Sequence, residues 1–125
     1  MATIYCPAEY DGFISVVNAP TWALARDAED GNYYRNQTNS PFAIRASRGA
    51  ARGGGYVYSI YRSFLTFNTA SIGDAPEEAV LRIYGYNDDN ADMFVVKSTQ
   101  AVEFGNDDFD SITGWSSGDN EGNVT

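Results

Sequence analysis

The chain has 125 residues and a formal charge of −9, with 17 acidic against 8 basic residues. We therefore expect one domain and no nucleic-acid partner, because neutralising phosphates requires a basic surface. The chain contains no histidine, which removes the Ser-His-Asp and Cys-His arrangements and the usual transition-metal ligand, so we expect no enzyme. No apolar run is long enough to span a bilayer, so membrane insertion is not expected either.

The first third of the chain is predicted to hold two strands and one helix. Ile4–Cys6 and Gly12–Val17 are rich in strand-forming residues. Residues 18–31, "NAPTWALARDAEDG", combine an early proline, residues at helical spacing and a final glycine, which predicts a helix of about two to three turns. Cys6 is the single cysteine, so no internal disulfide can form and we expect a buried thiol.

A strand and a basic loop are predicted next. Residues 42–47, "FAIRAS", alternate as a half-buried strand must, with Phe42, Ile44 and Ala46 on the face expected to cover the core. The loop "SRGAARGGG" then carries Arg48 and Arg52. It can be interpreted as an anion or acidic-glycan contact, since Arg matches carboxylate geometry, or as a solvated loop. The solvated loop is favoured, because the loop lacks the pattern of a phosphate-binding loop.

The middle of the chain is predicted to contain two strands from different sheets. Residues 56–67, "YVYSIYRSFLTF", leave almost no polar face, which indicates a central strand covered on both sides, with Arg62 in need of a partner. A second run follows at residues 80–86, and the connector 68–79 is too long for a tight hairpin but suits a crossing between two facing sheets. The expected strand core is Phe64, Leu65, Phe67, Leu81 and Ile83.

Candidate binding residues lie in the second half of the chain. The second run would point Arg82, Tyr84 and Tyr86 outward, and with Trp115 the two tyrosines are candidates for a sugar-stacking platform; packing under loops or at a subunit interface is the alternative. Two acidic clusters offer the oxygen ligands that calcium prefers, but neither has EF-hand spacing, and turn chemistry is favoured for both. The clusters are Asp88, Asp89 and Asp92, and Asp107, Asp108 and Asp110. No other cofactor is expected.

A family resemblance rests on residues 61–86, "YRSFLTFNTASIGDAPEEAVLRIYGY". The succession of strand, connector and "LRIY" strand resembles the signature of DNRLRE-type jelly-roll modules and related carbohydrate-binding modules. "DGFIS" and "TWALARDAEDG" are similar to uncharacterised phage and bacterial structural or adhesion proteins. The resemblance implies an all-β jelly-roll β-sandwich, with one short helix near the N-terminus, used for sugar binding, adhesion or structural display.

Two functions remain as expectations. The first is a non-enzymatic structural or adhesion module of an assembled particle or surface appendage, such as a phage virion, tail or fibre, at the virion or extracellular surface. Its partners would be protein subunits of the same assembly, in a homo-oligomer. The alternative is a carbohydrate-binding module of an exported polysaccharide-handling system. Residues 1–125 would form one sandwich with fewer strands than the about eight of a jelly roll, so we expect neighbouring chains or polypeptide beyond residue 125 to complete it.

Overall fold

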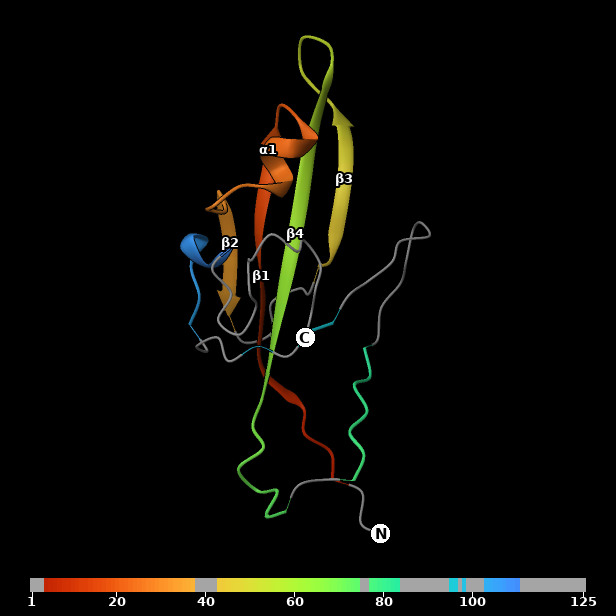
Figure 1. Ribbon diagram of the computed structural model, residues 1–125, viewed down its shortest axis with the longest axis vertical. Helices are drawn as coiled ribbons and strands as arrows, with labels where there is room; N and C mark the ends of the chain where they lie inside the picture. The colour runs from red at the N-terminus through yellow and green to blue at the C-terminus, as the bar shows by residue number, and fades with distance from the viewer. Residues whose placement is uncertain are drawn as a thin grey trace.

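The computed structural model describes residues 4–37, 43–74, 77–83, 95–96, 98 and 103–110. This part of the chain is mostly β, with an antiparallel sheet of strand order β2-β1-β4-β3 and one short α-helix (Figure 1). The expectation of a β-rich fold with one short helix near the N-terminus is confirmed. The elements are β1 (Ala8–Ala19), α1 (Trp22–Arg26), β2 (Tyr33–Gln37), β3 (Arg45–Ala50), β4 (Tyr56–Phe67) and the 3-10 turn η1 (Asn106–Asp108).

Three antiparallel strand pairs build the sheet. β1 pairs with β2, β3 pairs with β4, and the long strands β1 and β4 pair with each other at the centre, from Ala8 opposite Phe67 to Ala19 opposite Tyr58. A register shift interrupts this central pairing between Val16 and Ala19. Asn18 lies in the bulge with φ 61°, a left-handed conformation that asparagine tolerates better than most residues.

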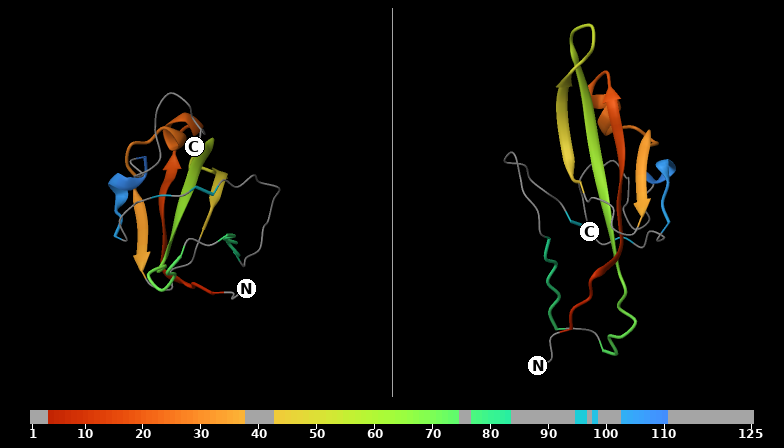
Figure 2. Two further views of the ribbon diagram at one scale, coloured as in Figure 1. Left: turned by 60° about the horizontal axis from the view of Figure 1, so that its bottom comes forward. Right: turned by 180° about the vertical axis from the view of Figure 1, so that it is seen from behind.

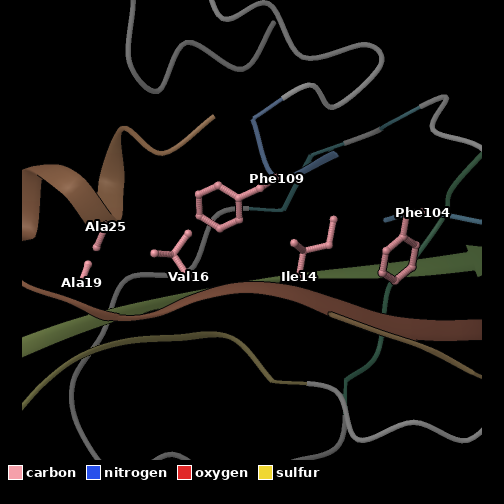
Figure 3. Close-up of a cluster of buried hydrophobic side chains, with 6 residues drawn as sticks. All are labelled: Ile14, Val16, Ala19, Ala25, Phe104 and Phe109. Carbon is pink, nitrogen blue, oxygen red and sulfur yellow. The ribbon is translucent and has the colours of Figure 1, made fainter. Parts of the chain in front are cut away.

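The two faces of the sheet differ because side chains alternate along a strand. On β1, Ile14 and Val16 belong to the face that α1 and η1 cover, which we call the helix face. Phe13 and Ser15 belong to the opposite face, which we call the aromatic face. Figure 3 shows the core on the helix face, where Phe104 and Phe109 lie over β1. The buried core cluster is Ile14, Val16, Ala19, Ala25, Phe104 and Phe109.

Helix α1 is capped at its N-terminus by Thr21 and is shorter than predicted. The Thr21 hydroxyl accepts a hydrogen bond from the Leu24 N–H at 3.2 Å, and Ala25 is fully buried in the core cluster. The predicted helix exists, but its predicted length is wrong, since it has 5 residues. The chain leaves the helix so that Gly31 can pack against β1, where a Cβ atom would lie 2.5 Å from Ile14 Cγ2. The Gly31 N–H then donates to the Asn106 carbonyl at 2.7 Å.

Residues 104–109 are attached to the sheet by aromatic and cationic contacts. Phe104 stacks on Phe64, with ring centroids 4.7 Å apart. It lies over Gly12, where a Cβ atom would come within 2.6 Å of the Phe104 ring. The Arg62 guanidinium donates to the Phe109 carbonyl and lies 4.1 Å from the centre of the Phe109 ring. The prediction that Arg62 needs a partner is therefore confirmed, and this arginine fastens the cover of the core to β4.

Several strand predictions are confirmed and others are wrong. Gly12–Val17 lies within β1, and β4 has the predicted bounds and is central, with a partner strand on each side. The expected cover of both faces of β4 is incomplete, because every residue of this strand stays at least partly exposed. Ile4–Cys6 precedes the first strand rather than forming one. The strand predicted at 42–47 begins at Arg45 and continues into the predicted basic loop. Its expected role in covering the core is wrong, because the cover lies over β1 and leaves Ile44 47% exposed. Phe42 lies outside the described residues.

The predicted strand core is correct only in part. Phe64 packs against the core cluster, and Leu65 is half-buried. Phe67, Leu81 and Ile83 are 37%, 43% and 40% exposed, so their assignment to the core is wrong. Residues 77–83 carry no strand, because phenylalanines from residues 104–109 supply the apolar cover that the second run was expected to supply. The facing sheet expected after connector 68–79 does not form within the described ranges, and Cys6 is half-buried rather than buried.

Candidate interaction surfaces

Charge is strongly segregated along the chain. Residues 31–73 contain no acidic residue, whereas all 17 acidic residues of the protein lie in residues 1–30 and 74–125. The same acid-free stretch carries five of the 8 basic residues, and it forms β2, β3 and β4. The five are Arg35, Arg45, Arg48, Arg52 and Arg62. Three of the four strands are therefore basic in a chain whose net charge is strongly negative.

The five arginines differ in their contacts. Arg62 is held by the Phe109 carbonyl and by Asp110, whose Oδ1 lies 3.3 Å from Arg62 Nη1. The other four are exposed and form no ion pair within the part of the chain that the structure describes. Arg26, by contrast, binds Asp27 through two hydrogen bonds of 2.5 and 2.9 Å, which lower the pKa of the Asp27 carboxyl.

The turn between β3 and β4 forms a projecting basic tip, which we call the arginine hairpin (residues 48–56). Gly53, Gly54 and Gly55 all have positive φ, at 98°, 98° and 84°, a conformation that glycine adopts without steric cost. The Arg48 guanidinium lies 4.4 Å from the centre of the Tyr56 ring. Figures 1 and 2 show this hairpin extending beyond α1 at one end of the sheet. Arg48 and Arg52 therefore belong to a segment that projects at this end of the sheet.

The aromatic face carries a row of side chains across the whole sheet. The strand registers align Tyr33 of β2, Ser15 of β1, Tyr61 of β4 and Arg45 of β3. The neighbouring row aligns Arg35, Phe13 and Ser63. Two tyrosines and two arginines are thus brought to one face from the three basic strands.

Phe13 holds the two tyrosines in place. Its ring is only 6% exposed and lies 5.8 Å from the ring of Tyr33 and 5.3 Å from the ring of Tyr61, measured between centroids. The fully buried Ser15 hydroxyl donates to the Tyr33 carbonyl at 3.2 Å. Tyr33 nevertheless remains 45% exposed. The face therefore presents an aromatic surface whose members share one buried neighbour.

The residues predicted as sites are brought together only in part. Arg48 and Arg52 lie in the arginine hairpin, where Arg48 belongs to β3 rather than to the predicted loop. Arg82 is exposed in the extended segment 77–83. The remaining candidates lie outside the described residues: Tyr84, Tyr86 and Trp115 for sugar stacking, and Asp88, Asp89 and Asp92 for calcium.

The second acidic cluster has structural roles. An oxygen of Asp108 accepts a hydrogen bond from the Gly105 N–H at 2.8 Å, and Asp110 pairs with Arg62. In the described ranges, no group of three or more Asp, Glu, Cys or His side chains is arranged to hold a metal ion. These contacts agree with the turn chemistry that the sequence favours for residues 107–110.

A shallow depression lies where the N-terminal segment meets the end of β4. Asn68 donates to Glu9 there, with 3.0 Å between Nδ2 and Oε1, and Cys6 lines the same surface. None of the described residues that line it is cationic, and a cysteine thiol needs such a neighbour to become a reactive thiolate. Among the described residues, the depression therefore offers no group that would activate Cys6.

The most informative surface residues were missed from the sequence. Strand β2, "YYRNQ", was not predicted, and with it Tyr33 and Arg35 escaped notice. The signal that could have found them is the acid-free stretch 31–73, because a run of arginines without acidic neighbours is unusual in so acidic a chain. Phe104 and Phe109 were also missed, since they lie among turn-forming residues.

None of the described helices is long and apolar enough to cross a membrane. Comparison of the chain with protein-family models, with curated proteins and with solved structures found no match. Function must therefore be argued from the surfaces themselves.

Proposed function

We propose that this protein is a non-enzymatic structural or adhesion module of an assembled particle or surface appendage, of the phage virion, tail or fibre type. It would act at the virion or extracellular surface, together with protein subunits of the same assembly. The observation that carries the proposal is the arginine hairpin, which projects from a chain of charge −9 and whose arginines form no ion pair with another described residue. Such complementary charges steer copies of one protein toward each other and set their register.

The fold proposed for this module is the jelly roll that residues 61–86 resemble. The antiparallel sheet would be one half of the sandwich. A second sheet would then be completed by the rest of the chain, by neighbouring subunits or by polypeptide beyond residue 125. The exposed apolar side chains of the extended segment 77–83 support this arrangement, since Val80 is 65% exposed and Leu81 43%. Burying such side chains in a neighbour is favourable by about 25 cal/mol per Å² of apolar surface.

The partner proposed for the arginine hairpin is a second copy of this chain. Arg48 and Arg52 would meet the acidic segments of the neighbour, because all 17 acidic residues lie outside the stretch that carries the hairpin. Tyr56 is 56% exposed beside Arg48, and exposed tyrosine and arginine are enriched where protein interfaces form. The association should weaken with salt, because the Debye length falls from about 10 Å at 0.1 M to about 3 Å at 1 M.

The test is light scattering on the full chain at low and high salt. We expect concentration-dependent association at low salt that decreases at about 0.5 M salt, as screening of exposed charges requires. The double variant Arg48→Glu/Arg52→Glu should remain monomeric under both conditions. The control Arg35→Glu/Arg45→Glu changes the net charge equally but leaves the hairpin intact, so it should still associate. A wild-type chain that stays monomeric at every concentration, or a control that fails as completely as the hairpin variant, would contradict the proposal.

The second candidate function is the carbohydrate-binding module of an exported polysaccharide-handling system. The observation that favours it is the aromatic face, where Tyr33 and Tyr61 flank the buried Phe13. Aromatic rings offer sugars a broad apolar surface with a polar edge. A glycan array separates the two candidates, because a chain that only assembles should bind no glycan.

A further inference from the structure

We propose that the aromatic face is a binding site for an anionic polysaccharide of low charge density, with sugar rings seated on Tyr33 and Tyr61 and their carboxylates bound by Arg35 and Arg45. The inference rests on the second candidate function, the carbohydrate-binding module, and names its ligand class. It uses none of the residues of the arginine hairpin. The proposals for the aromatic face and for the arginine hairpin can therefore be tested independently.

The spacing of the row suits an extended ligand that lies across the strands. Tyr33 and Tyr61 are two strands apart, which is about 10 Å at a strand separation of 4.8 Å. Arg45 follows on the next strand beyond Tyr61. The ligand therefore meets aromatic surface, a small serine, aromatic surface and a guanidinium in succession, as a chain of sugars with an acidic substituent would require.

The aromatic surface is rigid before any ligand binds. Both tyrosine rings contact the Phe13 ring, which is 6% exposed, and the Ser15 hydroxyl donates to the Tyr33 carbonyl. The Ser63 hydroxyl beside Phe13 donates to the Ala43 carbonyl at 2.6 Å and so holds the segment that enters β3. Pre-organised contacts bind more tightly, because less conformational entropy is lost on association.

The charges on this face favour an anionic ligand. Arg35 and Arg45 are exposed, and neither forms an ion pair with another described residue. An arginine guanidinium matches the planar geometry of a carboxylate with two parallel hydrogen bonds. Asp11, two residues before Phe13 on β1, is a carboxylate of the strands that alternation places on this side, and it is already engaged by an interaction within the protein.

The net charge of the whole chain limits the charge density of the ligand. A charge of −9 repels a polyphosphate, and double-stranded DNA carries one negative charge per about 1.7 Å. Arg35 and Arg45 lie on the two outer strands, so three strand separations of about 14 Å divide them across the sheet, and they also belong to neighbouring rows. Carboxylates spaced along a sugar chain can meet these two arginines while adding little further repulsion, so an acidic polysaccharide fits better than a nucleic acid.

The experiment is affinity electrophoresis of the full chain in gels that contain alginate, hyaluronate, neutral dextran or poly(A). We expect retardation by one or both acidic polysaccharides, and none by dextran or poly(A). Tyr33→Ala/Tyr61→Ala and Arg35→Gln/Arg45→Gln should each weaken binding by about tenfold or more, the effect expected of losing one good contact. Arg48→Gln/Arg52→Gln is the matched control and should bind as the wild type does.

A second variant keeps the test independent of folding defects. Asp11→Asn removes the carboxylate from this face and should strengthen retardation by acidic polysaccharides, which no unfolded protein would do. Absence of retardation by either acidic polymer would overturn the inference, as would equal retardation by dextran or stronger retardation by poly(A). Loss of binding in the control but not in Arg35→Gln/Arg45→Gln would also overturn it. Light scattering of the same samples reports self-association separately, so failure here is distinguishable from failure of the proposed assembly function.

Discussion

Strands β1 and β4 are each 12 residues long and pair with each other at the centre of the sheet, yet they differ in burial. Five consecutive residues of β1, from Gly12 to Val16, are buried, whereas every residue of β4 remains at least partly exposed. The sequence of β4 is nevertheless at least as apolar as that of β1. Apolar content therefore predicts that a strand is central, but it does not predict how deeply the strand is buried.

The difference lies in what covers each strand. Ala25 of α1 lies over Ala19, and Phe109 lies over Val16 and Ile14, so the helix face of β1 is enclosed (Figure 3). On β4, Tyr58, Ile60 and Phe64 reach the same cluster only from its side. Burial of an apolar side chain depends on contacts from both sides, and two short distant segments supply those contacts to β1.

The largest expected effect comes from removing that cover. Phe109→Ala deletes a fully buried ring from the core and should lower the free energy of unfolding by about 3 to 5 kcal/mol. Phe67→Ala is the matched control on β4, and since Phe67 is 37% exposed, its cost should be smaller, at about 1 to 2 kcal/mol. Urea unfolding followed by tyrosine and tryptophan fluorescence measures both. Equal losses of unfolding free energy in the two variants would show that β1 and β4 are buried to the same depth, contrary to the comparison above.

Adding a side chain at a glycine of β1 also tests whether β1 is more tightly covered than the other strands. Gly12→Ala places a methyl group against the Arg35 carbonyl and within 2.6 Å of the Phe104 ring. We expect a loss of about 1 to 3 kcal/mol, as for other overpacked cores. Gly49→Ala in β3 is the control, because its Cβ would meet only Val57 Cγ2 at 3.9 Å. Thermal unfolding should show a clear decrease for the first variant alone. An unchanged midpoint for Gly12→Ala would mean that Phe104 does not pack on β1.

The smallest effect is expected in the segment first predicted to be core. Ile83→Ala should change the free energy of unfolding by less than about 1 kcal/mol in the isolated chain, because the side chain is 40% exposed. Its effect should grow if assembly buries residues 77–83, and unfolding at high and low protein concentration measures that growth. A large cost at high dilution would place Ile83 in the core of the monomer after all.

Particular residues explain which strands and helices could be predicted from the sequence and which could not. Tyr56–Phe67 was correctly bounded because Gly53–Gly55 precede it and Asn68 follows it, and such turn-forming residues act locally. The helix within residues 18–31 was recognised from its proline and spacing, but it stops early because Gly31 must approach Ile14, a contact that no local pattern reveals. The candidate binding surfaces were harder to predict from the sequence. Arg48 and Arg52 were found as a cluster, but their separation from Arg35 and Arg45 depends on strand register.

The amino-acid sequence by itself determined that the described part of this chain is β-rich, that this part has one short helix, and where β4, one of its two central strands, lies. Those features follow from backbone preferences and side-chain alternation, which act over a few neighbouring residues. Only the tertiary structure decided that Phe104 and Phe109 cover β1, and that Tyr33, Tyr61, Arg35 and Arg45 share one face. Burial and adjacency across strands depend on which distant segments return to pack together, and this is settled by the free energy of the whole fold rather than by local preference.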